Sequence, residues 1–130
     1  MTDIHRQTAT RLPFDEARVR AALATAWSRE TAVQWSPENP ANGQCNVTAA
    51  VVADLFGLEI LRTELGDVWH YYNRADGRRV DLTDSQFTAP GARFDPPAPY
   101  DDLATDKAAA MEGIPDREYD ALRAALLARL

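Results

Sequence analysis

The stretch "VWHYYNRADGRRVDLT", residues 68–83, constrains the fold of this chain more than any other segment. Asp76 and Gly77 form a two-residue turn signal, because both tolerate the positive φ angles that tight hairpins require. The residues before the turn are rich in aromatic and β-branched side chains, which favour a strand. If Asp76-Gly77 is the whole loop, Ala75 faces Arg78 and the register of an antiparallel hairpin is fixed.

This register predicts a functional pair. Tyr72 then faces Asp81 and His70 faces Thr83, so His70 and Asp81 are diagonal neighbours on one face of the hairpin. Diagonal partners lie about 7–8 Å apart at Cα, close enough for an imidazole and a carboxylate to form a hydrogen bond. A slip of one residue would put the two side chains on opposite faces. The other face, with Trp69 and its neighbours, is expected to pack under a helix.

The single cysteine, Cys45, lies at the start of a predicted helix, "CNVTAAVVADLF", residues 45–56, which should end at Gly57. A helix N-terminus and a nearby imidazolium both stabilise a thiolate. We therefore expect Cys45 to be a nucleophile, His70 its general base and acid, and Asp81 the group that orients the ring. Free N–H groups of the helix and the side chain of Gln44 could stabilise an oxyanion.

The remaining patterns predict an α+β domain, with helices packed on a small antiparallel sheet of three or more strands. Helices are expected over residues 13–28, 45–56, 105–111 and 114–130, and strands over 58–64, 68–74 and 78–83. At 130 residues the chain should form one domain. We expect residues 1–12 to be flexible and the proline-rich residues 88–102 to form a wrapping loop.

Composition argues against several classes of function. The net charge is −6 and no cluster of Lys or Arg occurs, which disfavours nucleic acid and anionic membranes as partners. The N-terminal residues lack the apolar core of a signal peptide, so we expect a cytoplasmic protein. One cysteine excludes an internal disulfide. Neither paired metal-ligand spacing nor a glycine-rich phosphate loop is present, so we expect neither a metal nor a cofactor.

Two segments carry a family resemblance: "WSPENPANGQCNVTAAVVAD", residues 35–54, and "HYYNRADGRRVDLTDSQF", residues 70–87. They resemble the YunG-like family of small bacterial proteins, over about residues 35–87. More remotely, a cysteine on a helix followed by a histidine and an aspartate on strands is similar to the papain-like and transglutaminase-like superfamily. That likeness implies a core of this type, with Cys45, His70 and Asp81 as catalytic residues and Gln44 as an oxyanion helper.

Two functions follow as hypotheses. The first is acyl transfer, in which a small-molecule or peptide amide or thioester is hydrolysed or its acyl group passes to an amine. The second is a binding module without enzymatic activity, which keeps the three residues as a structural network. In either case we expect Trp35, Asn39, Trp69 and Tyr72 to contact the ligand or substrate. Thiol reactivity separates the two, because a binding module should have an ordinary, shielded cysteine.

Overall fold

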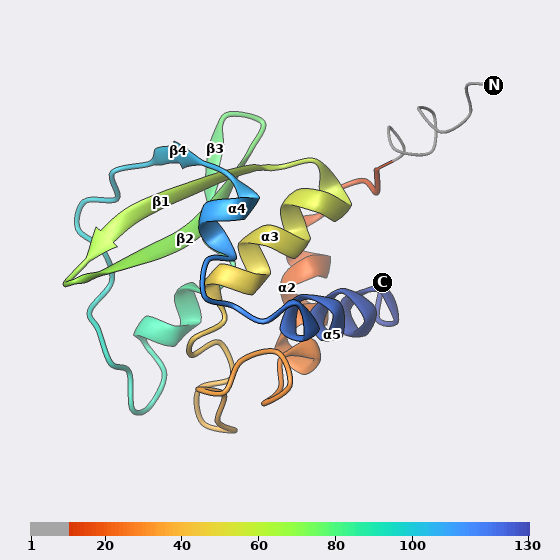
Figure 1. Cartoon of the computed structure of the whole chain (residues 1–130), viewed down its shortest axis with the longest axis horizontal. Coiled ribbons are helices and arrows are strands. Elements are labelled where there is room, and N and C mark those ends of the chain that lie inside the picture. Colours follow the sequence, from red (N-terminus) through yellow and green to blue (C-terminus); the bar gives the residue numbers. More distant parts are fainter. Residues whose placement is uncertain (1–10) are drawn as a thin grey trace.

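A computed structural model describes residues 11–130 (Figure 1). The helices are α2 (Glu16–Ala26), α3 (Cys45–Phe56), α4 (Lys107–Ala110) and α5 (Asp116–Leu127). The strands are β1 (Glu59–Leu65), β2 (Val68–Ala75), β3 (Arg78–Val80) and β4 (Leu103–Thr105), and a short 3₁₀ helix spans Asp84–Phe87. Figure 1 shows the sheet on one side of the molecule and α2, α3 and α5 gathered on the other. The predicted α+β class is confirmed.

The sheet is antiparallel throughout, in the order β3-β2-β1-β4. Its β2–β3 hairpin has the predicted two-residue turn, because Ala75 pairs with Arg78, and Asp76 and Gly77 have φ angles of 51° and 76°. The predicted register is therefore confirmed next to the turn, but the expected pairs Tyr72–Asp81 and His70–Thr83 do not form. Pairing ends at Val80, opposite residue 73, so the edge of β2 beside residues 68–72 has no partner from β3.

Helix α3 positions the cysteine. It begins at Cys45 and ends at Phe56, as the sequence predicts, and Gly57 closes it in the left-handed conformation with φ 72°. Most of its side chains are buried, and it packs against β2 and α5. A buried amide joins it to the sheet: Asn73 Nδ2 donates to the carbonyl oxygens of Ala49 at 3.2 Å and Glu59 at 3.1 Å.

The two faces of the sheet are covered differently. Tyr71 and Ile60 project from one face and pack with Ala49 of α3 and Ala110 of α4. Helices thus cover the expected face at Tyr71, whereas Trp69 on the same face is exposed. The main core joins α2, α3, α5 and the end of the hairpin; its members include Val19, Leu23, Val51, Val80, Leu82, Leu122 and Leu126. Residues 70 and 72 point to the opposite face, where aromatic rings from the segment after β3 pack on them.

Several boundaries differ from the sequence prediction. Strand β4, which the pattern does not indicate, pairs with β1 over only three residues and leaves Leu103 exposed, so it has no clear alternation. The third strand stops at Val80 instead of residue 83. Helices begin later than expected where an aspartate caps them: Asp15 accepts from Arg18 N at 3.1 Å, and Asp106 from Ala109 N at 2.9 Å.

The two segments expected to lack regular structure behave as follows. Residues 1–10, most of the segment expected to be flexible, lie outside the described residues. Leu12 is held, because its N–H donates to Leu55 O at 3.0 Å. Residues 88–102 contain neither helix nor strand, and this loop returns to the sheet, where Asp102 N donates to Tyr72 Oη at 2.8 Å.

Candidate active site around Cys45, His70 and Asp81

His70 and Asp81 form the pair that the hairpin register predicts. His70 Nε2 lies 2.7 Å from Asp81 Oδ2, and the two residues are only 1% and 7% exposed. The chain leaves β3 directly before Asp81, so the carboxylate approaches the ring from the end of the strand. The predicted contact between these two side chains is confirmed.

The carboxylate of Asp81 is fixed by further donors. Its Oδ2 accepts a second hydrogen bond from Tyr100 Oη at 2.7 Å. Its Oδ1 accepts from Thr83 N at 3.3 Å and Thr83 Oγ1 at 3.4 Å. Both oxygens are therefore occupied, and the carboxylate can hold His70 in one orientation.

The imidazole of His70 is enclosed by aromatic rings. It stacks on Tyr72 with ring centroids 5.6 Å apart and meets the edge of Phe87 at 5.1 Å. Burial opposes the charged ring, but the hydrogen bond to the Asp81 carboxylate, with a further contribution from the neighbouring Cys45, outweighs burial and raises the pKa of His70 to about 9. The Asp81 carboxylate thus favours the imidazolium form of the ring.

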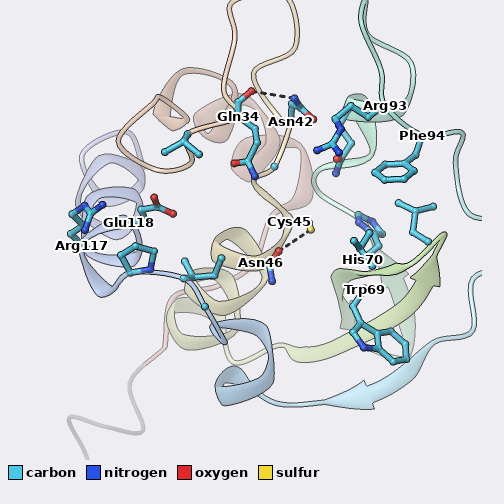
Figure 2. Close-up of a pocket in the computed structure, with 18 residues that line it drawn as sticks. Gln34, Asn42, Cys45, Asn46, Trp69, His70, Arg93, Phe94, Arg117 and Glu118 are labelled. Atoms are coloured by element: carbon cyan, nitrogen blue, oxygen red, sulfur yellow. Dashed lines mark hydrogen bonds between the residues drawn. The ribbon is translucent and has the colours of Figure 1, made fainter.

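Cys45 is the first residue of α3 and is half-buried. It lines the same pocket as His70, and its Sγ donates to Asn46 Oδ1 at 3.4 Å (Figure 2). Because Asp81 occupies Nε2 of His70, Nδ1 is the ring nitrogen available to the thiol. No side chain caps the start of α3 and its first turn carries no acidic residue, so its free N–H groups present a positive field beside the sulfur.

The pocket around Cys45 has a volume of about 450 Å³. Figure 2 shows Trp69, Arg93 and Phe94 on the His70 side, and Arg117 and Glu118 of α5 on the other. Gln34, from the loop before α3, enters between these two sides. The thiol thus has aromatic rings together with Arg93 on one side, and the charged pair Arg117 and Glu118 on the other.

Of the four residues expected to contact a ligand, Trp69 lines this pocket and the other three do not. The side chain of Tyr72 is buried beneath the loop of residues 88–102, where its Oη donates to Asp102 Oδ1 at 2.9 Å. Asn39 is buried and donates from Nδ2 to Gln86 O at 3.1 Å. Trp35 packs against the main core. These three side chains support the walls of the site.

Gln44 has its side chain turned away from the thiol. It is fully buried: its Oε1 accepts from Thr31 Oγ1 at 2.8 Å, and its Nε2 donates to Ser28 O at 3.4 Å. The amide that the sequence assigned to an oxyanion instead ties the start of α3 to the turn after α2. It does not line the pocket.

Several pocket residues were missed at the sequence level. Gln34 and Asn42 lie in the loop before Cys45. Their nearness to Cys45 in the sequence was the one signal that could have identified them as pocket residues. Phe94 comes from the proline-rich loop and Glu118 from the last helix, and neither belongs to a motif. Their meeting depends on how loops and α5 pack, which short-range patterns do not encode.

Two further findings concern metal ligands and membrane-spanning helices. Among residues 11–130, no group of three or more His, Cys, Asp or Glu side chains is arranged to hold a metal ion. No helix in that part of the chain is long and apolar enough to cross a membrane.

Comparison with known proteins shows which family the chain belongs to. The model of the YunG protein family matches residues 15–130, nearly all of the described chain. The chain belongs to the YunG family. It is 43% identical over 72 residues to the "Uncharacterized protein YunG" of Bacillus subtilis (strain 168), a match that covers 55% of this chain and 63% of that relative. The chain thus spans somewhat less than two thirds of that YunG protein's length. No solved structure matches. The resemblance to the YunG family is confirmed.

Proposed function

We propose that this protein is a cysteine-dependent acyl-transfer enzyme, with Cys45 as nucleophile, His70 as general base and acid, and Asp81 as the orienting residue. The observation that carries this proposal is the buried His70–Asp81 pair, 2.7 Å long, beside a pocket that Cys45 also lines. Nucleophile, base and orienter in this order form the minimal set for covalent acyl transfer.

The first step is attack by the Cys45 thiolate on the carbonyl carbon of an amide or thioester. A C–S bond forms, and the carbonyl oxygen becomes an oxyanion. The His70 imidazolium, with its raised pKa, then gives its proton to the leaving amine or thiol as the C–N or C–S bond breaks. The product of this step is an acyl group held as a thioester on Cys45.

The second step releases the acyl group. Neutral His70 takes a proton from water or from an acceptor amine, which attacks the thioester carbonyl. The C–S bond breaks, the thiolate re-forms beside the imidazolium, and an acid or a new amide leaves. Asp81 orients the ring in both steps, because its two oxygens are fixed by His70, Tyr100 and Thr83.

The oxyanion is stabilised by the uncapped N–H groups of the first turn of α3. The side-chain amide of Gln34 points into the same pocket and is a candidate second donor (Figure 2). Gln44 acts as a positioning residue, because its buried amide fixes the residue that precedes the thiol.

A papain-like or transglutaminase-like core is part of the same proposal. Support comes from the arrangement of the parts: a cysteine at a helix start packed on an antiparallel sheet, a histidine on one strand of a hairpin, and an aspartate directly after the other strand. The substrate would be a small molecule or a short peptide. A catalytic free thiol is best maintained in a reducing compartment, so we place the protein in the cytoplasm.

Alkylation of Cys45 by iodoacetamide as a function of pH tests the proposal. The chain has one cysteine and two histidines, so the label reports one site and His5→Ala is a matched control. We expect wild type and His5→Ala to react at their plateau rate by about pH 6, as a thiolate paired with an imidazolium does. His70→Ala, or His70→Gln if the first is poorly folded, should react only as the pH approaches about 8.5.

The second candidate is a binding module without catalysis. It is favoured by the contact of Sγ with Asn46 Oδ1 at 3.4 Å, which directs the sulfur to a side chain other than His70, and by the aromatic side of the pocket at Trp69 and Phe94. In that case wild type and His70→Gln would show the same alkylation profile, with a midpoint near the ordinary thiol pKa of about 8.5. That result would remove the acyl-transfer proposal.

A further inference from the structure

Glu118 is a buried carboxylate that the proposed mechanism does not use. It is 8% exposed and lines the Cys45 pocket from the first turn of α5. Figure 2 shows its carboxylate at the pocket, opposite the His70 side. Within residues 11–130, no side chain forms a hydrogen bond or an ion pair with it. Its oxygens are not among the fully enclosed side-chain atoms that lack a partner, so the carboxylate is open to the pocket and available to a ligand.

A structural role at the helix terminus does not supply the missing partner. Glu118 is the third residue of α5, where a glutamate usually accepts from the backbone N–H of the N-cap residue. Here the N-cap is Pro115, which has no N–H to donate. The first turn of a helix is a favourable position for an acidic residue, and the carboxylate oxygens here remain free for a ligand.

The neighbouring cations do not neutralise it. Arg117 also lines the pocket but is exposed and forms no ion pair with Glu118. Arg93 lies at the opposite side of the pocket, beside Phe94 (Figure 2). The α5 side of the pocket therefore holds an available negative charge within the cavity that contains the thiol.

We propose that Glu118 recognises a cationic group, an ammonium or a guanidinium, of the substrate that reacts at Cys45. This inference rests on the proposed function and specifies its substrate class: an amide whose acyl or amine portion carries a positive charge. A carboxylate in a partly enclosed site binds such a group through short, charge-assisted hydrogen bonds. The aromatic side at Trp69 remains for an apolar portion of the same molecule.

A pair of thiol reagents that differ in charge tests this proposal. 2-Aminoethyl methanethiosulfonate is cationic and 2-sulfonatoethyl methanethiosulfonate is anionic. In each reaction the Cys45 sulfur attacks the sulfenyl sulfur, an S–S bond forms, and methanesulfinate leaves. The ratio of the cationic to the anionic rate cancels the intrinsic reactivity of the thiol and reports the charge preference of the pocket.

The variants are Glu118→Gln, Glu118→Asp and the matched control Asp116→Asn. Asp116 belongs to the same helix turn, but it is exposed and lines a different cavity. Its variant therefore makes the same change in net charge outside the Cys45 pocket. At low ionic strength we expect Glu118→Gln to lower the rate ratio by about fivefold or more. Asp116→Asn should leave the ratio within about twofold of wild type. Glu118→Asp, which keeps the charge, should stay closer to wild type than Glu118→Gln does.

An unchanged rate ratio in folded Glu118→Gln would overturn the inference. An equal fall of the rate ratio in Glu118→Gln and Asp116→Asn would overturn it as well. Thermal melting of each variant establishes that it is folded, and Glu118→Asp provides a second variant if Glu118→Gln is not. The pH profile of alkylation tests the thiolate separately. If Glu118→Gln lowers the rate ratio as expected but Cys45 has an ordinary alkylation profile, the acyl-transfer proposal fails and the cation site at Glu118 remains.

Discussion

At the scale of single residues, the candidate site depends on Asp81. One carboxylate accepts hydrogen bonds from His70, Tyr100 and Thr83, and these donors come from β2, the long loop and the chain that follows β3. Loss of one partner from such a buried network leaves the others with unmet hydrogen bonds. The same network raises the pKa of the buried His70, which has a measurable consequence for stability.

That consequence is a dependence of stability on pH. The pKa of His70 rises from the ordinary 6.5 to about 9, so its contribution to stability is fully present below about pH 6.5 and is lost as the pH rises through about 9. We expect the free energy of unfolding of wild type to fall across this window, by at most about 3 kcal/mol. Urea denaturation at about pH 6 and about pH 9.5 measures the change.

His70→Gln is the control, because it removes the titrating group and should show little of this fall. A parallel loss of stability in wild type and His70→Gln would mean that His70 carries no charge in the folded protein. The unfolding slope with urea should be similar at both pH values, since the two-state comparison requires it.

At the scale of elements, the two ends of α3 are terminated in different ways. The start is uncapped and carries Cys45, whereas the end is closed by Gly57 in a left-handed conformation. A β-carbon at Gly57 would come within 2.5 Å of the end of the Arg11 side chain, which is flexible and can move away. Backbone strain, and not this contact, should therefore dominate the effect of a substitution.

Gly57→Ala should lower the free energy of unfolding by about 1–2 kcal/mol, the cost of a left-handed alanine. Gly77→Ala is a matched control for strain, because Gly77 has φ 76° and its β-carbon would meet nothing within 4 Å. We expect the two variants to lose similar stability in chemical denaturation. A loss at Gly57 that is several-fold larger than at Gly77 would show that Arg11 cannot move.

At the scale of the whole molecule, the site is assembled by packing α3 against the sheet. Cys45 and His70 lie on elements that touch only through this packing, and Asn73 provides its buried polar link. Because the amide of Asn73 donates to both α3 and β1, its removal leaves two carbonyl oxygens without this donor. The distance between nucleophile and base depends on this joint.

Asn73→Ala should therefore lower the free energy of unfolding by about 2 kcal/mol, through lost hydrogen bonds and a small cavity. It should also slow alkylation of Cys45 at about pH 6, since the thiolate depends on its distance from His70. Thr88→Ala is the control, because Thr88 lies outside the pocket and its hydroxyl bond to Ser85 O is exposed. Full reactivity in a destabilised Asn73→Ala protein would mean that this link supports the fold without adjusting the site.

The sequence by itself determined the local parts of this protein. Asp76-Gly77 specified the hairpin, and the alternation of side chains then put His70 beside Asp81, because the two-residue period of a strand leaves no freedom once the turn is known. The apolar run closed by Gly57 specified α3 and put Cys45 at its start. Each inference used interactions between residues that are near in the chain.

Only the tertiary structure decided what surrounds these parts. Gln44 was assigned to an oxyanion from its position beside Cys45, but its amide is buried against the turn after α2. Glu118 entered the pocket through the packing of α5, and Phe94 through the path of a long loop. Such contacts join segments far apart in the chain, and their free energies arise from shape and burial in the assembled molecule, so no local pattern of residues encodes them.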